Sequence, residues 1–361
     1  MQHSSEDIFT LRWGILGAGR VAASFCGDLS PTVAEFRGLS KIRHVVQAIG
    51  SSSLEKAEIF ARQSCPWASP HLYATYEALL KDNEVDIVYI ATPHACHLEN
   101  ALAAIEAGKH VLVEKPMAIN SRQAVTMVER ARANGVYLVE GMGLRFFEVC
   151  RQLQTLLHEE KILGNIHRMV VDFGLYLPFK DQPPESRMVD VKLGAGCLLD
   201  IGVYPLTWAR MIAQADPLHH QTEPLMGSML SINKGTDEMC SVIFKYPQTQ
   251  VQAICTASFL HKSAEDFARI EGDKGTIHIY GIASRPQGFR VELFGETTET
   301  HDFSMSNMKG FFFEADSVAK DLQDGKLESS IMPLDESLYM MELLDQIRAS
   351  GGVVYPEDTS V

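Results

Sequence analysis

The first 145 residues alternate short apolar runs with segments whose apolar positions recur at helical spacing. The helical segments begin near residue 21 and at 53, and then cover 97–108 and 121–135. The apolar runs lie at 12–17 (RWGILG), 43–50 (RHVVQAIG), 85–92 (VDIVYIAT), 110–116 (HVLVEKP) and 135–141 (GVYLVEG). Strands that are apolar throughout and joined by helices are typical of a parallel sheet covered on both faces. The pattern therefore predicts a doubly wound α/β domain.

The pattern changes after about residue 146. A helical segment at 151–164 is followed by strand-like stretches at 167–177, 226–233, 240–246, 251–259, 268–280 and 289–295. Several of these alternate apolar and polar residues, which predicts a large, mainly antiparallel open sheet with one wetted face. Two helices are expected over 310–327 and 334–352. We therefore expect an α/β domain over residues 1–145 and an α+β domain over 146–361, with the last helices able to pack back on the first domain.

Composition and charge narrow the class of protein. The chain has 361 residues, is 46% hydrophobic and carries a net charge of -14. Such an acidic surface repels phosphate backbones and anionic lipids, so neither nucleic acid nor a membrane is an expected partner. The first ten residues contain no apolar core of a secretory signal. Seven scattered cysteines are consistent with free thiols in a reducing compartment, and we expect a cytoplasmic protein.

A glycine motif lies directly after the first apolar run. The sequence Gly17-Ala18-Gly19-Arg20-Val21-Ala22 fits the pattern G-x-G-x-x-A at the opening of a helix. Gly17 permits a tight turn, and Gly19 lets the backbone approach a pyrophosphate near the helix N-terminus. A glycine turn without function is the alternative, but the strand–helix units that follow favour a dinucleotide-binding Rossmann domain. The expected cofactor contacts are therefore Gly17, Ala18, Gly19, Arg20 and Val21.

The end of the second run indicates which dinucleotide binds. An NAD site normally has an acidic residue there for the ribose 2′-hydroxyl, whereas this chain has Ser51, Ser52 and Ser53. The serine hydroxyls, a helix N-terminus and Lys56 would accommodate a 2′-phosphate. Ser53 could instead cap the helix, and the two roles are compatible. The sequence favours NADP(H) over NAD(H).

Two segments carry candidate chemistry. HVLVEKP places Glu114 and Lys115 at the carboxyl end of a parallel strand, where ligands of such sheets bind. In GAGCLLDIGVYPL, Asp200 and Tyr204 are four residues apart and share one face if the segment is helical. A tyrosine whose pKa is lowered by an ammonium group can exchange a proton with an alcohol, and the carboxylate can orient its partners. The structural alternatives are a surface lysine, a helix cap and a core aromatic residue.

The segment HACH raises the question of a metal. His94, Cys96 and His97 are of residue types that ligate metal ions, but a second cluster of such residues at suitable spacing is missing from the sequence. We expect no metal site.

Five sequence motifs support a resemblance to a known superfamily. WGILGAGRVA, VDIVYIATPHACH, AGKHVLVEKPMAIN, GAGCLLDIGVYPL and DGKLESSIMPLDES occur in the order seen in one superfamily. Over nearly its whole length the chain resembles the glucose–fructose oxidoreductase / inositol dehydrogenase superfamily, and within it the dimeric dihydrodiol dehydrogenases and NADP-dependent D-xylose 1-dehydrogenases. The resemblance implies a homodimer formed through the C-terminal sheet.

The resemblance also implies roles for individual residues. Lys115 and Tyr204 would act at the substrate hydroxyl, with Asp200 assisting. The residues expected at the cofactor, besides those above, are Thr92, Pro93, His94, His97, Glu114, Lys115 and Arg145.

The chain departs from the resemblance after the sixth strand. Where relatives have a tryptophan that walls the substrate pocket, this chain has Gly143, and Glu148 replaces a proline. Unless another side chain fills the gap, the pocket should be wider. Phe173 aligns with an aromatic residue that faces the substrate in those relatives, although it could be plain core. We expect Gly143, Phe173 and Tyr204 to line the substrate, and a bulkier or less sugar-like substrate than xylose.

The sequence thus favours an NADP-dependent oxidoreductase. It would transfer a hydride between the nicotinamide and a secondary alcohol, hemiacetal or carbonyl of a sugar, cyclic diol or related molecule. The alternatives are a ketone or imine reductase of secondary metabolism and a non-catalytic NADP-sensing regulator. The presence of both Lys115 and Tyr204 favours an enzyme.

Overall fold

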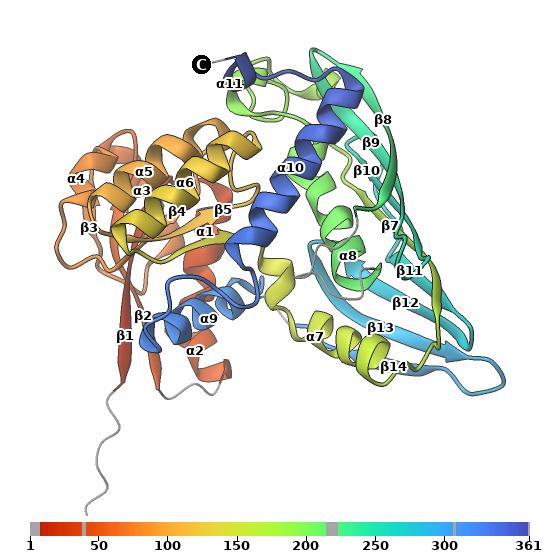
Figure 1. The fold of residues 1–361 in the computed structure, drawn as a ribbon. Coiled ribbons are helices and arrows are strands. Elements are labelled where there is room, and N and C mark those ends of the chain that lie inside the picture. The colour runs from red at the N-terminus through yellow and green to blue at the C-terminus, as the bar shows by residue number, and fades with distance from the viewer. Residues whose placement is uncertain (1–7, 38–40, 214–222, 306–307, 360–361) are drawn as a thin grey trace, which may run out of the picture. The chain divides into compact units, whose positions relative to one another are not determined.

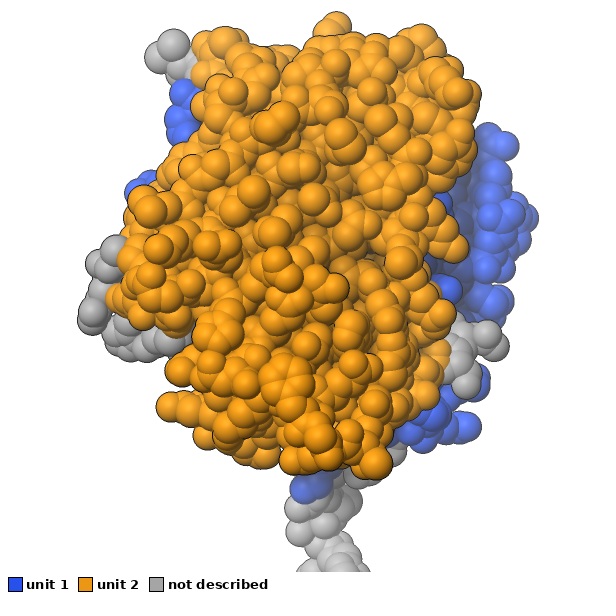
Figure 2. Space-filling view, turned by 90° about the vertical axis from the view of Figure 1, so that its right-hand side faces the viewer, with its two compact units in different colours: residues 1–118, 122–143, 306–337 blue, residues 119–121, 144–305, 338–361 orange. Residues whose placement is uncertain are grey.

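The computed structural model describes residues 8–37, 41–213, 223–305 and 308–359. The chain divides into two compact units, which Figure 2 colours separately. Unit 1 comprises residues 1–118, 122–143 and 306–337, and unit 2 comprises 119–121, 144–305 and 338–361. Each unit is thus assembled from three stretches of chain, whereas the expected domains were two continuous ranges that met at residues 145 and 146.

Unit 1 contains a six-stranded parallel sheet in the order β3-β2-β1-β4-β5-β6. Its strands are β1 (Phe9–Leu16), β2 (Ile42–Gly50), β3 (His71–Tyr73), β4 (Ile87–Ile90), β5 (His110–Glu114) and β6 (Leu138–Gly141). The five apolar runs all form strands, and β4, β5 and β6 are buried almost throughout. The predicted doubly wound parallel sheet is confirmed.

Helices surround this sheet (Figure 1). They are α1 (Arg20–Asp28), α2 (Pro31–Arg37), α3 (Leu54–Ser64), α4 (Tyr76–Leu80), α5 (His97–Glu106), α6 (Ser121–Asn134) and α9 (Phe311–Gln323). A cluster of aromatic side chains joins α1 to the sheet. Phe25 of α1 stacks on Tyr89 of β4 with ring centroids 3.9 Å apart and meets Trp13 of β1 edge to face. Helix α9 packs against α1, β1 and β2.

Unit 2 contains an eight-stranded sheet in the order β14-β13-β12-β11-β7-β10-β9-β8. Its strands are β7 (Ile166–Gly174), β8 (Leu225–Asn233), β9 (Thr236–Lys245), β10 (Gln252–Ser258), β11 (Asp266–Gly272), β12 (Gly275–Ile282), β13 (Arg285–Leu293) and β14 (Glu299–Asp302). Every pairing is antiparallel except that of β7 with β10. The prediction of a mainly antiparallel open sheet is confirmed.

One face of this sheet is covered by α8 (Val203–Ala213), which packs on β7 and β10. A π-helical turn, Leu198–Gly202, leads directly into α8. Helix α7 (Glu148–Gln154) continues as a second π-helical turn, Thr155–Glu159. The remaining helices are α10 (Leu334–Gly351) and α11 (Pro356–Thr359). Among the described helices, none combines the length and the apolar character that a membrane span requires.

Candidate active site

The glycine loop has the backbone geometry that its motif predicts. Gly17 follows β1 with a φ of +102°, and a Cβ atom there would lie 2.8 Å from the carbonyl oxygen of Ala91. Its N–H donates to the carbonyl of Gly50 at 3.2 Å. Only glycine fits a position with this φ and this close an approach. The loop therefore lies at the carboxyl ends of β1, β2 and β4.

Gly19 gives the loop an open side. It is the N-cap of α1 and has no side-chain capping bond, and a Cβ atom there would meet nothing within 4 Å. Ala18, Gly19 and Arg20 are exposed, and Val21 is half-buried. The first-turn N–H groups of α1 thus lie at an open surface, which is the cradle that a pyrophosphate requires. These residues fit a dinucleotide.

The serine turn after β2 divides into structural and open positions. Ser53 caps α3 by accepting from the Lys56 N–H at 3.3 Å, so the capping interpretation holds for this serine. Ser51 is buried, and its N–H donates to the Tyr73 carbonyl at 3.2 Å. Ser52 is exposed and accepts from the Lys56 ammonium group at 3.0 Å. A hydroxyl beside an ammonium group is chemistry that binds a phosphate.

The segment after β4 is fixed from inside the unit. The two ring nitrogens of His97 lie 3.0 Å from the carbonyl oxygens of Thr92 and Pro116. Burial lowers the pKa of His97 to about 4, so the neutral ring donates to one of these two carbonyls. Asn100 donates to the Thr92 hydroxyl at 3.0 Å, and His94 is buried with its ring 5.7 Å from that of His97. His97 thus links the predicted nicotinamide segment, which includes Pro93, to the chain that follows Lys115.

Lys115 lies directly after β5, where buried carboxyl groups accept hydrogen bonds from its own N–H and from the N–H of Met117. Glu114 accepts from the Tyr89 hydroxyl at 2.5 Å and from the Lys115 N–H at 3.3 Å. Glu140, at the end of β6, accepts from the Met117 N–H at 3.0 Å. Both acids are less than 10% exposed. The chain before and after Lys115 is therefore fixed at the carboxyl edge of the sheet.

A third buried carboxyl group lies beside Gly143. A Cβ atom at Gly143 would lie 3.3 Å from Oε2 of Glu314, and only the carboxyl carbon of Glu314 is also within 4 Å. Glu314 is fully buried, and burial together with the nearby Glu114 and Asp28 raises its pKa well above the usual range. This carboxyl group therefore keeps its proton to a higher pH than an ordinary glutamic acid does. The carboxyl group of Glu314 thus lies on the side of Gly143 to which a side chain at this position would point.

Unit 2 carries the second group of candidates. Asp200 lies in the π-helical turn and Tyr204 in the first turn of α8, so the segment is helical, as the shared-face prediction requires. Arg187 donates to Asp200 at 3.3 Å. The Phe173 and Tyr204 rings meet edge to face with centroids 5.6 Å apart. Two of the residues predicted to line the substrate are therefore in contact.

Arg145 also belongs to unit 2. It is half-buried in the 3₁₀ turn Gly143–Phe146 that follows β6. Burial raises the pKa of the Cys150 thiol, and the Arg145 charge opposes that shift. The predicted residues are thus divided between the two units: Lys115, Glu114 and Gly143 belong to unit 1, and Arg145, Phe173, Asp200 and Tyr204 belong to unit 2.

Sequence reasoning missed the buried polar residues around Lys115. Glu140 offered a signal, because it is the only acidic residue in the apolar run 135–141. Tyr89 and Glu314 offered none, because each lies in a segment that reads as ordinary core. Their partners become apparent only when distant parts of unit 1 are brought together.

Known proteins resemble the chain over nearly its full length. The NADP(+)-dependent D-xylose 1-dehydrogenase of Hypocrea jecorina is 34% identical, with 98% of this chain and 95% of that protein covered. The trans-1,2-dihydrobenzene-1,2-diol dehydrogenase of Xenopus laevis is 32% identical, with 96% of this chain and 99% of that protein covered.

Solved structures share the fold. A 3-ketoreductase from Actinomadura kijaniata, crystallised with NADP and TDP-benzene, has a TM-score of 0.77 at 23% identity. An aldose-aldose oxidoreductase from Caulobacter crescentus, crystallised with glycerol, has the same TM-score and identity. Each alignment covers 95% of this chain and 98% of the other.

Two family profiles match the chain. Residues 11–142 match the oxidoreductase family with an NAD-binding Rossmann fold, and residues 150–278 match the GFO/IDH/MocA C-terminal domain. Together with the full-length relatives, these matches show that the chain belongs to the GFO/IDH/MocA family of oxidoreductases.

Proposed function

We propose that this protein is an NADP-dependent oxidoreductase that acts on a CH–OH group of a sugar, a cyclic diol or a related small molecule. The observation that carries the proposal is the position of Lys115 at the carboxyl edge of the parallel sheet, where buried Glu114 accepts from the Lys115 N–H and buried Glu140 accepts from the N–H of Met117. The full-length likeness to an NADP(+)-dependent xylose dehydrogenase and to dihydrodiol dehydrogenases supports the same reaction class.

The cofactor would bind along this edge of the sheet. The open N-terminus of α1 at Gly19 would take the pyrophosphate, and Ser52 with Lys56 would take the 2′-phosphate. Residues 50–54 contain no carboxylate that would repel this phosphate. When bound, NADP(H) accepts or supplies the hydride.

The protein's own residues would handle the oxygen and the proton of the substrate. Lys115 would donate a hydrogen bond to the substrate oxygen, and Tyr204 would take the hydroxyl proton during oxidation and return it during reduction. Asp200 would orient these groups. Gly143, Phe173 and Tyr204 would line the substrate, and the lack of a side chain at Gly143 is the reason to expect a substrate bulkier or less sugar-like than xylose.

A second copy of the chain would cover the outer face of the unit 2 sheet. Leu225 and Met229 of β8 and Ile243 of β9 are exposed there, between 52% and 77%. Figure 2 looks onto this broad face of unit 2. We propose a homodimer formed through it, since exposed apolar side chains on one sheet face are typical of an interface. The cysteines Cys26, Cys65, Cys96, Cys150, Cys197, Cys240 and Cys255 are all free thiols, which fits a cytoplasmic protein.

Cofactor and substrate can be tested with purified protein. Because a ligand that binds the folded state raises the apparent stability, NADPH should raise the melting temperature more than NADH at equal concentration. NADP(+) reduction is then followed with D-xylose, other sugars and cyclic diols, and NADPH oxidation with cyclic ketones. We expect turnover of at least one alcohol and slower turnover of xylose. Preference for NADH, or no turnover across the panel, would contradict the proposal.

A further inference from the structure

The π-helical turn that carries Asp200 begins at a buried acid. The N–H of Leu198 donates to Oδ2 of Asp237 at 2.6 Å, and Asp237 is fully buried. Gly196 makes this approach possible, since with a φ of +131° a Cβ atom there would lie 2.5 Å from Oδ1 of Asp237. Asp237, from the start of β9, therefore caps the turn that leads into α8.

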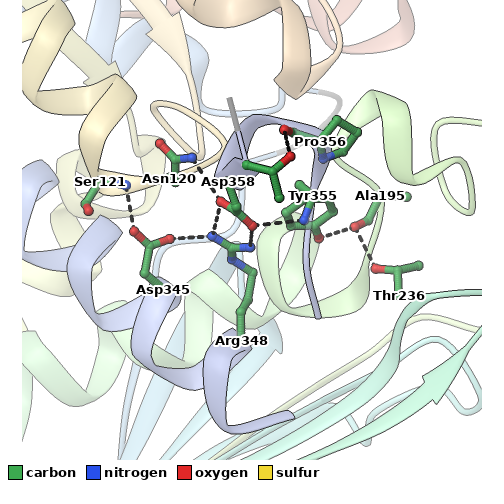
Figure 3. Close-up of polar contacts among 10 residues, drawn as sticks. Asn120, Ser121, Ala195, Thr236, Asp345, Arg348, Tyr355, Pro356 and Asp358 are labelled. Carbon is green, nitrogen blue, oxygen red and sulfur yellow. Dashed lines mark hydrogen bonds and ion pairs between the residues drawn. The ribbon is translucent and has the colours of Figure 1, made fainter. Parts of the chain in front are cut away.

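The backbone just before this cap is held by two hydroxyl groups. The carbonyl of Ala195 accepts from the Tyr355 hydroxyl and, at 2.8 Å, from the Thr236 hydroxyl (Figure 3). Tyr355 and Thr236 are both buried. The entry to the π-helical turn is thus fixed to β9 and to the C-terminal segment.

The same C-terminal segment is bound to an arginine–carboxylate network. Arg348 of α10 donates to Asp358 at 2.7 Å and to Asp345 at 2.5 Å, and it is only 3% exposed. Asp358 accepts from the Tyr355 N–H at 2.9 Å, which joins the network to the hydroxyls described above. Two guanidinium nitrogens of Arg348 donate to Asp358, and a bidentate pair of this kind holds a fixed geometry.

The network ends on the chain that follows Lys115. Asn120 donates to Asp358 at 2.9 Å, and the N–H of Ser121 donates to Asp345 at 2.8 Å (Figure 3). Asn120 is five residues after Lys115 in the sequence. Every residue of the network lies in unit 2. The hydrogen bonds connect Asn120 to Thr236, and the next residue in the chain, Asp237, accepts from the Leu198 N–H.

We propose that Tyr355, Thr236 and Asp237 are positioning residues, which hold the turn of Asp200 and Tyr204 in register with the segment that follows Lys115. The proposal rests on the function given above. A π-helical turn is rare and frequently marks a functional site, and here its first N–H and the carbonyl just before it are held by these residues. Because a displacement of about 1 Å can cost a catalytic site a factor of about 100, loosening this support should slow the chemical step.

The test compares the double variant Tyr355→Phe/Thr236→Val with Tyr137→Phe. The double variant removes both hydroxyls from the Ala195 carbonyl. Tyr137 is an equally buried tyrosine of unit 1 whose hydroxyl donates to Asp321 at 3.1 Å, so it is a matched control outside the network. Amide hydrogen exchange over residues 197–212 is measured by mass spectrometry. The panel alcohol that the wild type oxidises fastest gives kcat and the primary deuterium isotope effect, and fluorescence titration gives the Kd for NADPH.

We expect faster exchange over residues 197–204, a fall in kcat of about tenfold or more, a larger isotope effect and an unchanged Kd. Tyr137→Phe should show none of these changes. Faster exchange with kcat within twofold of wild type would overturn the proposal, as would an equal loss of kcat in Tyr137→Phe. If the wild type oxidises no alcohol of the panel, the proposed function itself fails, whereas the exchange data still report whether the network holds the turn.

Discussion

Lys56, in the first turn of α3, is the side chain that we propose decides the choice of cofactor. Its ammonium group is exposed beside the Ser52 hydroxyl. A hydrogen bond to a charged group contributes about 1.5–3 kcal/mol, so Lys56→Ala should weaken NADPH binding by about tenfold or more. NADH has no 2′-phosphate, and its affinity should be unchanged. Fluorescence titration of both nucleotides measures this.

Lys274 provides the control for this change, because it is exposed in unit 2 and distant in sequence from the cofactor motifs. Lys274→Ala should leave both affinities at the wild-type values. Equal weakening of NADPH and NADH in Lys56→Ala would mean that Lys56 does not contact the 2′-phosphate.

At the residue scale, the sequence predicted the roles of residues whose conformation depends on their neighbours in the sequence. The φ of Gly17 and the capping bond of Ser53 follow from their places between a strand and a helix. Glu314 and Asp237 could not be predicted, because their effect comes from burial against distant residues. Glu314 lies against Gly143, and Asp237 lies against Leu198.

At the element scale, most of the long elements were predicted and the short ones were not, although the single stretch at 268–280 forms two strands, β11 and β12. Each apolar run of the first 145 residues forms a strand. The three-residue strand β3, the strand β14 and the short helices α2 and α4 have too few residues to show a period. The helix predicted over 151–164 begins earlier, and it ends as a π-helical turn at Glu159. Such turns are rare, and the spacing of apolar residues does not distinguish a single π-helical turn from an α-helix.

The cap of the π-helical turn should make stability depend on pH. Burial raises the pKa of Asp237 from 3.8 to about 6. The folded state therefore binds this proton more tightly than the unfolded state does. The stability that this bound proton contributes is fully present below pH 3.8 and is lost as the pH rises through about 6. The total loss is about 3 kcal/mol. Asp237→Asn should remove this loss, as measured by urea unfolding at pH 4.5 and 7.5.

Asp273 is a useful control with the opposite sign. The Asn165 N–H, and then His167, lower its pKa, so its contribution is present above pH 3.8 and is lost as the pH falls. Asp273→Asn should therefore not reproduce the effect of Asp237→Asn. An unchanged pH dependence in Asp237→Asn would show that this acid is not protonated in the folded state at pH 4.5.

At the scale of the whole molecule, the sequence predicted two architectures and could not predict how the chain divides between them. The change from buried parallel strands to alternating strands is visible along the chain. The membership of residues 119–121 in unit 2 is not, whereas the sequence allowed the last helices to pack back on the first domain, and residues 306–337 belong to unit 1. The division depends on contacts such as those of Asn120 with Asp358 and of Arg37 with Asp316, which join residues far apart in sequence.

The proposed homodimer can be tested on the outer face of the unit 2 sheet. Met229→Glu/Ile243→Glu places two charges among apolar side chains of that face, and we expect it to convert the dimer to monomer. Phe294→Glu, at a residue 74% exposed after β13, is the control and should remain dimeric. Light scattering after size-exclusion chromatography gives the masses. A monomeric wild type, or an unchanged mass in the double variant, would contradict the proposed interface.

The central claim is that Tyr204 and Lys115 act on one substrate in an NADP-dependent reaction, and Tyr204→Phe tests it most directly. The measurement is kcat of this variant with the best alcohol of the panel, together with the Kd for NADPH. Because a positioned acid–base group contributes a factor of about 100 to 10,000, we predict a fall in kcat of at least about 100-fold with the Kd within twofold of wild type. Turnover within a few-fold of wild type would contradict the account.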